Sequence, residues 1–136
     1  MLAVSSEGVR VNDSNGDLTF LQSNDTYQPG QWYHVAGVYD GQEMRLYVDG
    51  QLQASSNVQS GDIYYPSATE FVIGAYKDSD EFYPLSGQMD EVRLWNRVRT
   101  AEEINRDQRS RLQGNEYGLV GYWRLDELTG TTVKDA

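Results

Sequence analysis

The pattern of apolar and polar residues is most regular between Gln31 and Gly50. Trp32–Tyr39 is mostly apolar at both odd and even positions, as expected for a central strand that is covered on both faces. After a glycine-containing turn, every second residue of Met44–Val48 is apolar, which indicates a strand with one buried face. The Asp49-Gly50 pair then favours a tight turn that returns Gln51–Ala54 along the same strand. We therefore predict an antiparallel meander of three strands.

The rest of the chain adds further short strands separated by turns. Leu2–Leu21 is predicted to form a hairpin around the polar stretch Asp13–Asp17, and Glu70–Tyr76 is predicted to be another strand. Asp13, Asn15 and Asp17 alternate as in a calcium loop, but Leu18 stands where such a loop needs glycine, so a turn is favoured. Ten tyrosines and thirteen glycines agree with many strands and turns. With 136 residues, one all-β domain with its own core is expected.

One helix is predicted near residues 100–112. Thr100-Ala-Glu-Glu103 has the spacing of a capping box, in which the threonine and glutamate side chains bond each other's backbone N–H groups. Ile104 and Leu112 then lie on one helical stripe. Gly114 is a plausible residue to end the helix. We expect this helix to pack on one end of the strands.

Charge and composition exclude several classes of function. The net charge is −10, which argues against nucleic acid and anionic membranes, because both select basic surfaces. The chain has no cysteine, so it forms neither disulfides nor thiolate metal sites. No apolar run has the length of a membrane span, and Met1–Arg10 lacks the basic start and apolar core of a signal peptide. We therefore expect no nucleic acid partner and no membrane insertion.

Two ordered motifs carry a resemblance to a known family. Trp32–Gly41, WYHVAGVYDG, and Leu46–Gly50, LYVDG, resemble the laminin-G-like modules of the concanavalin A-like lectin/glucanase superfamily. Gly87–Arg97, GQMDEVRLWNR, followed by Arg99–Ile104, is similar to the segment that closes such modules. The resemblance implies an antiparallel jelly-roll β-sandwich that binds glycans or extracellular proteins, often with calcium. It also implies an extracellular or cell-surface location.

The C-terminal segment of the chain has an unexpected position in the sequence. Gly118–Asp135 resembles the first strand of a laminin-G-like module, which in that family normally stands at the front. We therefore predict that residues 1–117 form the main part of the sandwich and that residues 118–136 dock on it or on a neighbour. Because part of the front then has no counterpart, a homo-oligomer or contact with neighbouring modules is expected. The alternative is a smaller, self-sufficient sandwich in which Leu2–Leu21 covers the gap.

Candidate ligand-binding residues flank the predicted strand Glu70–Tyr76. Aromatic rings can stack on the apolar face of a sugar, and carboxylates can accept hydrogen bonds from its hydroxyl groups. A solvated loop with its aromatic residues packed onto the core is the alternative interpretation, and the sequence favours it. The candidates are Tyr64, Tyr65, Tyr76, Asp78, Asp80, Phe82 and Tyr83.

Calcium, which the resemblance implies, would be held by Asp90 and Asp135. Asp90 has the same strand parity as Val92, so both point inward if Val92 does. A buried carboxylate needs a hydrogen-bond, ionic or metal partner. Backbone N–H groups or a tyrosine are the alternative partners of Asp90, and they are favoured over calcium.

The sequence lacks the pattern of a catalytic site. Glucanase relatives carry E-x-D-x-x-E on one strand, whereas Asp90-Glu91 are adjacent and therefore point to opposite faces. His34 is the only histidine and lies in an apolar strand, where a core residue is favoured over a catalytic base. We therefore predict a noncatalytic module for carbohydrate recognition or extracellular adhesion. A structural spacer or self-assembly module is the alternative, and a fragment of a glycoside hydrolase ranks behind both.

Overall fold

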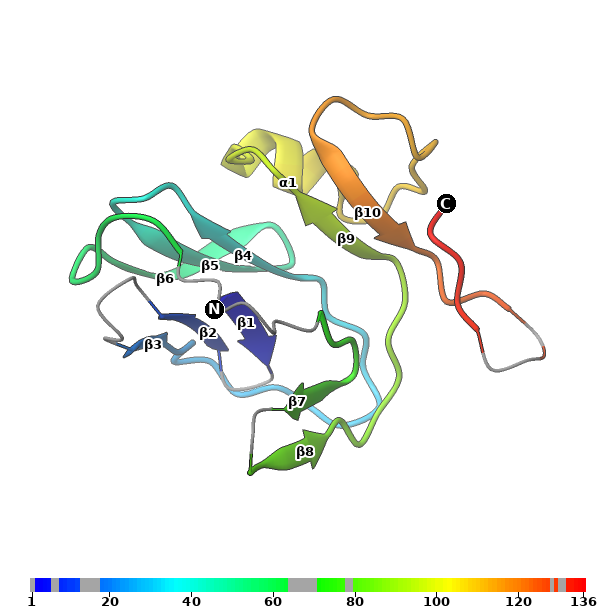
Figure 1. Cartoon of the computed structure of the whole chain (residues 1–136), viewed down its shortest axis with the longest axis horizontal. Coiled ribbons are helices and arrows are strands. Elements are labelled where there is room, and N and C mark those ends of the chain that lie inside the picture. Colours follow the sequence, from blue (N-terminus) through cyan, green and yellow to red (C-terminus); the bar gives the residue numbers. More distant parts are fainter. Residues whose placement is uncertain are drawn as a thin grey trace. The chain divides into compact units, whose positions relative to one another are not determined.

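The computed structural model describes residues 2–5, 8–12, 18–63, 71–77, 80–127, 129 and 132–136. Strands dominate this part of the chain, and one short helix accompanies them (Figure 1). The elements are β1 (Leu2–Ser5), β2 (Gly8–Asn12), β3 (Leu18–Leu21), β4 (Val35–Tyr39), β5 (Met44–Val48), β6 (Gln51–Ser56), β7 (Ala75–Lys77), β8 (Phe82–Pro84), β9 (Val92–Trp95), α1 (Ala101–Asp107) and β10 (Leu119–Trp123).

The chain divides into two compact units. The first unit consists of Met1–Phe71 and Arg99–Arg109, and the second consists of Val72–Val98 and Ser110–Ala136. Every strand pair between the named strands is antiparallel. The prediction of antiparallel sheets with one short helix is therefore confirmed. Within the described residues, no helix has the length and apolar character needed to span a membrane.

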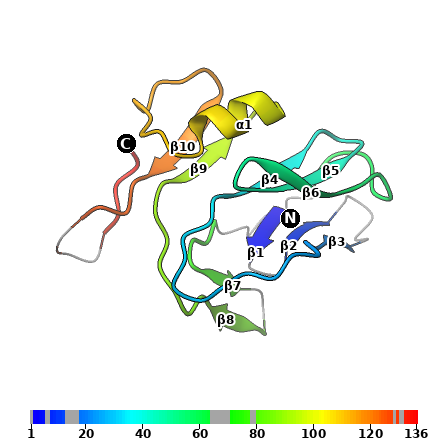
Figure 2. The same cartoon turned by 180° about the vertical axis from the view of Figure 1, so that it is seen from behind.

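The first unit contains two three-stranded sheets, ordered β1-β2-β3 and β4-β5-β6. In both views the two sheets lie one above the other (Figures 1 and 2). The predicted meander is present, with Val35 opposite Val48 and Val48 opposite Gln51. Its first strand, predicted to be central, instead begins at Val35 and lies at the edge of the sheet that the described residues form. The predicted turn at residues 13–17 falls outside the described residues, but β2 and β3 on either side of it pair as expected.

The core of the first unit lies on both faces of β5. Met44 and Leu46 are 0% and 2% exposed and pack with Leu21 at the end of β3. Tyr47, which the alternating pattern predicts to face outward, is also buried, because it packs with Val38 and with Ile104 of α1. The prediction of one buried face on β5 is therefore wrong: the helix covers the face opposite Met44 and Leu46.

The turn between β5 and β6 is fitted to the helix. Asp49 and Gly50 both have positive φ, 47° and 75°, as in the tight hairpin turns that prefer Asp-Gly. A Cβ atom at Gly50 would lie 2.6 Å from Asn105 Oδ1 and 3.1 Å from Asn105 Cα. Glycine is therefore required at this position both by its φ and by the close approach of α1.

Helix α1 begins as predicted and ends earlier than predicted. The Glu103 N–H donates to Thr100 Oγ1 at 3.2 Å, and the Thr100 N–H donates to Glu103 Oε2 at 3.0 Å, which is a complete capping box. The helix ends at Asp107 rather than near Leu112. Ile104 is its buried residue. The helix is therefore anchored by its cap and by one apolar side chain, and Leu112 is buried outside it.

The second unit contains two strand pairs, β7 with β8 and β9 with β10. β7 is shorter than predicted, since its strand begins at Ala75. Strand β10, from the unexpected tail, pairs with β9, with Trp123 opposite Val92. Asp135 forms a further bridge with Trp123, and the Ala136 N–H donates to the Tyr122 carbonyl at 2.8 Å. The tail thus docks within this chain, on the strand that the closing motif supplies.

Candidate functional site

The hairpin of β7 and β8 carries the described members of the predicted ligand site. Tyr76 of β7 lies directly opposite Tyr83 of β8, and their rings stack with centroids 6.2 Å apart and an interplanar angle of 27°. Phe82 and Tyr83 are 64% and 61% exposed. These two residues are therefore on the surface, which contradicts the alternative in which the aromatic residues pack onto the core.

Acidic groups accompany these rings. Asp80 and Glu81 are exposed and immediately precede β8. The Tyr83 hydroxyl donates to Glu81 Oε1 at 3.2 Å, so the carboxylate lies beside the ring. Exposed rings can cover the apolar face of a sugar, and carboxylates can accept from its hydroxyl groups. The candidates Tyr64, Tyr65 and Asp78 lie outside the described residues.

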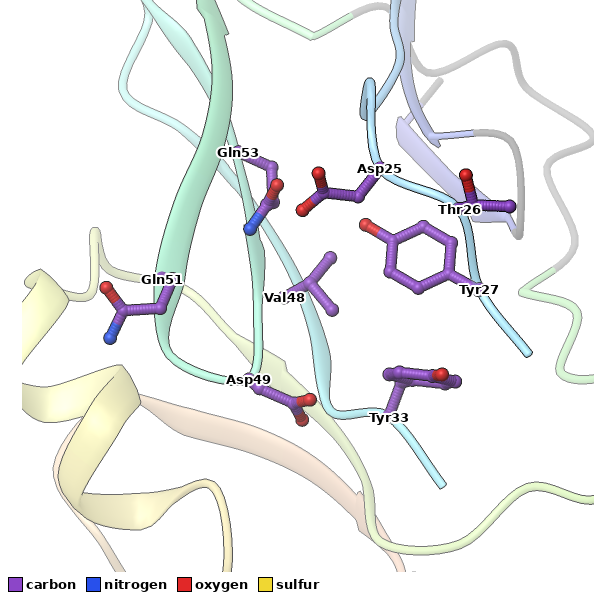
Figure 3. Close-up of a pocket in the computed structure, with 8 residues that line it drawn as sticks. All are labelled: Asp25, Thr26, Tyr27, Tyr33, Val48, Asp49, Gln51 and Gln53. Atoms are coloured by element: carbon purple, nitrogen blue, oxygen red, sulfur yellow. The ribbon is translucent and has the colours of Figure 1, made fainter. Parts of the chain in front are cut away.

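A second candidate site is a hollow of about 380 Å³ in the first unit (Figure 3). It lies between the segment that follows β3 and the turn between β5 and β6. We call it the Tyr27–Tyr33 hollow. It is lined by Asp25, Thr26, Tyr27, Tyr33, Val48, Asp49, Gln51 and Gln53.

The two tyrosines of this hollow are held in place by their hydroxyl groups. The rings of Tyr27 and Tyr33 meet edge to face, with centroids 5.0 Å apart and an interplanar angle of 71°. The Tyr27 hydroxyl is 2.6 Å from Ser23 Oγ. The Tyr33 hydroxyl accepts from the Gln28 N–H at 3.1 Å and donates to Gln31 Oε1 at 3.0 Å. Ring orientation is therefore fixed before any ligand arrives.

The base of the hollow is equally well anchored. Asp49 Oδ1 accepts from the His34 N–H at 3.0 Å, and the Asp49 N–H donates to the His34 carbonyl at 2.8 Å. Val48 beneath it is buried. By contrast, the side chains of Asp25 and Gln53 make no hydrogen bond or ion pair within the described residues. The hollow thus combines a fixed aromatic wall with polar groups that are available to a ligand.

Sequence reasoning missed this hollow because its residues are scattered. Tyr33 lies in the Trp32–Gly41 motif, which assigns it no ligand, and Gln51 and Gln53 show only that they share one face of a strand. Their proximity depends on the register of β5 with β6 and on the path of the chain after β3. An Asp-x-Tyr stretch before a meander was the available signal, and it has little specificity.

The expected inward orientation of Asp90 is wrong. Asp90 is exposed and precedes β9, and Glu91 between them has a φ of 54°. This left-handed residue interrupts the alternation, so the parity of Val92 does not extend to Asp90. Glu91 has the partners that were expected for Asp90, since its Oε2 accepts from the Tyr122 hydroxyl and from Arg93 Nη2 at 2.8 Å.

Asp135, the other predicted calcium ligand, has a backbone partner. Its Oδ1 accepts from the Tyr122 N–H at 2.7 Å, while the residue itself is exposed. Among the residues that the structure describes, no three His, Asp or Glu side chains form a group suited to a metal ion. Asp135 therefore has a structural contact that tail docking alone explains.

Outside the candidate sites, Asp40 and Asp107 have lowered pKa values for structural reasons. The backbone N–H groups of Glu43 and Gln42 lower the pKa of Asp40, and Arg45 adds to this effect. Arg106, and then Arg99, lower the pKa of Asp107 by hydrogen bonding to its carboxylate. These groups stabilise a turn and the helix, and they line neither candidate site.

Comparison with known proteins defines the class of this chain. The family model of the concanavalin A-like lectin/glucanases superfamily, in its laminin-G form, matches residues 4–105. The chain therefore belongs to this superfamily, as the motifs around Trp32 and Gly87 indicate. Its fold class is the concanavalin A-like β-sandwich with one short helix.

Two known proteins are similar to this chain in sequence. Mouse pappalysin-1 is 33% identical over 94 residues, and human pappalysin-1 is 34% identical over 95 residues. These matches cover 69% and 70% of this chain but only 6% of each relative.

Two solved structures are also similar. A candidate carbohydrate-binding protein from Bacteroides ovatus superposes with a TM-score of 0.71 at 28% identity, covering 89% of this chain and 36% of that protein. Residues 221–444 of an S-layer domain-containing protein from Clostridium thermocellum superpose with a TM-score of 0.52 at 22% identity, covering 76% and 58% of the two chains. The second similarity supports the fold alone.

Proposed function

We propose that this chain is a noncatalytic carbohydrate-recognition module of an extracellular or cell-surface protein. The observation that carries the proposal is the β7–β8 hairpin, where Phe82 and Tyr83 are exposed beside Glu81. Adjacent exposed aromatic side chains form a patch of the kind that marks a ligand-binding surface. Membership of a lectin-containing superfamily and the similarity to the Bacteroides protein support a sugar as that ligand.

The stacked pair gives the hairpin a defined ligand surface. Tyr76 supports Tyr83 from the neighbouring strand, so the Tyr83 ring does not need to be ordered when a ligand binds. Reducing that ordering cost improves affinity without adding a contact. The acidic groups beside the ring favour ligands with hydroxyl donors and disfavour anionic sugars.

Glycan binding by the wild-type chain and two variants tests the proposal. The double variant Phe82→Ala/Tyr83→Ala is expected to lose binding on a glycan array, because aromatic rings of this size contribute much of the contact area with a sugar. Tyr117→Ala is the matched control, since Tyr117 is 88% exposed in the same unit and lies outside the hairpin. Equal binding by all three chains would remove the hairpin from consideration, and no binding by the wild type would remove the function.

Two finer proposals belong to the same function. Calcium, expected from the family, would involve Asp90 and Asp135, whose exposed side chains offer the carboxylate oxygens that calcium prefers as ligands. Catalysis is not part of the proposed function, and the expected outcome of hydrolysis assays on common polysaccharides is no product. A measurable turnover would instead favour the hydrolase alternative.

A further inference from the structure

We propose that the Tyr27–Tyr33 hollow is a second binding position, which accepts one uncharged sugar unit independently of the β7–β8 hairpin. This inference rests on the proposed carbohydrate-binding function. It adds a site in the first unit whose residues include none of those predicted from the sequence. The evidence is the size of the hollow, its rings, its unengaged polar groups and its charge.

The size of the hollow suits a small ligand. Its volume of about 380 Å³ is near the lower end of the range of small-molecule sites, roughly 300–1,000 Å³. It is open to solvent and lined by side chains from two separate segments of the first unit (Figure 3). One sugar ring, free or at the end of a chain, fits this description better than an extended polymer does.

The aromatic wall offers ring surface rather than hydroxyl groups. Both tyrosine hydroxyls already have protein partners, Ser23 for Tyr27 and Gln28 and Gln31 for Tyr33. What remains for a ligand is the apolar surface of the two fixed rings. A pyranose ring has an apolar face of C–H groups that packs on such a surface, and a prepositioned wall lowers the entropy cost of binding.

The polar groups of the hollow match hydroxyl groups. Figure 3 shows the side chains of Asp25 and Gln53 turned toward one another beside the Tyr27 ring. The Asp25 carboxylate only accepts hydrogen bonds, whereas the Gln53 amide both donates and accepts. A sugar hydroxyl can donate to one group and accept from the other, so both can be satisfied by one ligand.

Charge then narrows the class of sugar. The lining contains two carboxylates, Asp25 and Asp49, and no lysine or arginine. Anionic sugars are therefore repelled. An ammonium group would satisfy the carboxylates and could contact the rings, but it would leave the Gln53 N–H donors without an acceptor. The combined donor and acceptor set favours an uncharged, hydroxyl-rich ligand.

Amide chemical-shift mapping of the whole chain tests the proposal with defined probes. The uncharged probes are methyl glucoside, methyl galactoside and N-acetylglucosamine, and the charged probes are glucosamine and glucuronate. At least one uncharged probe is expected to shift the amides of Asp25–Tyr33 and Gln51–Gln53. Glucuronate is expected to leave them unchanged.

A double variant, Asp25→Ala/Gln53→Ala, tests the polar groups. Loss of about one hydrogen bond from each side chain predicts roughly thirtyfold weaker binding at the hollow. Gln42→Ala/Asp62→Ala is the matched control, because it removes the same two side-chain types from exposed positions of the same unit outside the hollow. The control is expected to bind like the wild type, and circular dichroism verifies that both variants fold.

The possible outcomes separate this inference from the proposed function. If uncharged sugars bind and Asp25→Ala/Gln53→Ala binds as well as the wild type, the hollow is not a sugar site, while the hairpin proposal stands. A response of the hollow to glucosamine alone would make it an ammonium site and overturn the inference. If no uncharged probe shifts the Asp25–Tyr33 amides, the hollow proposal is overturned whatever the hairpin binds.

Discussion

The hydroxyl group of Tyr122 provides a quantitative test of how the second unit is stabilised. Tyr122 lies in β10 and is 0% exposed. Its hydroxyl donates to Glu91 Oε2 and accepts from the Leu112 N–H at 3.3 Å. Tyr122→Phe keeps the ring and removes only this hydroxyl. It leaves a buried backbone N–H group and one carboxylate oxygen without that partner.

The expected cost of Tyr122→Phe is about 2.5 kcal/mol. A hydrogen bond to a charged group is worth roughly 1.5–3 kcal/mol, and a neutral one about 1 kcal/mol. The lower part of the summed range applies, because the Glu91 side chain is 30% exposed and keeps its ion pair with Arg93. The Leu112 bond is long, which also reduces its contribution.

Urea unfolding at neutral pH measures this cost, with the free energy of unfolding extrapolated to water. Tyr117→Phe is the control, since it removes a hydroxyl from a residue that is 88% exposed and should change stability by less than about 0.5 kcal/mol. Hydrogen exchange of the β10 amides provides a local readout in the second unit. The change in protection is expected only in Tyr122→Phe.

A double-mutant cycle with Glu91→Gln isolates the Tyr122–Glu91 bond. A coupling energy of about 1 kcal/mol is expected for two side chains in contact. The reasoning is refuted if Tyr122→Phe is as stable as Tyr117→Phe. It is also refuted, for this bond specifically, if the two substitutions at Tyr122 and Glu91 are strictly additive.

Four shorter predictions follow from other contacts. Gly50→Ala should destabilise the first unit by more than about 1 kcal/mol. The control Gly30→Ala should cost less, because both positions have positive φ but only Gly50 faces α1. Equal melting temperatures of the two variants would contradict this. Because the pKa of Asp107 is lowered in the folded state, its carboxylate stabilises the fold fully at pH values above the unfolded pKa of about 3.9. This stabilisation is lost as the pH falls through the folded pKa of Asp107. Asp107→Asn should therefore reduce the acid sensitivity of urea unfolding. Calcium at about a hundred times its dissociation constant should add roughly 2.7 kcal/mol relative to EDTA, and identical melts would oppose it. Light scattering should show a homodimer or larger assembly, and a monodisperse monomer would favour the self-sufficient sandwich.

Local sequence rules predicted the elements that depend on local chemistry. The Asp49-Gly50 turn and the Thr100 capping box are present because each needs only residues a few positions apart. The same rules failed where a distant segment intervenes. Tyr47 is buried because Ile104, more than fifty positions later, covers its face. Strand alternation cannot reveal which elements pack on each side.

The candidate sites show the same division. Exposed rings on the β7–β8 hairpin could be anticipated, because Tyr76 and Tyr83 flank an acidic turn in the sequence. The Tyr27–Tyr33 hollow could not, since its polar groups come from Asp25 and Gln53 on separate segments. For Asp90, the parity argument failed at one residue, Glu91, whose positive φ no propensity rule predicts for glutamate. Predicting the candidate site residues therefore required more knowledge of the tertiary structure than predicting the strands did.

Asp135 separates a structural role of the tail from a role in calcium binding. Its Oδ1 accepts from the Tyr122 N–H, and this contact needs an acceptor oxygen but no negative charge. Calcium binding, in contrast, depends strongly on the number of charged ligands. Asp135→Asn keeps a carbonyl oxygen for Tyr122 and removes the charge, whereas Asp135→Ala removes both. If the carboxylate serves only to dock the tail, Asn should be as stable as the wild type with or without calcium. If it also binds calcium, Asn should match the wild type in EDTA and lose the calcium-induced stabilisation, while Ala should be destabilised in both conditions.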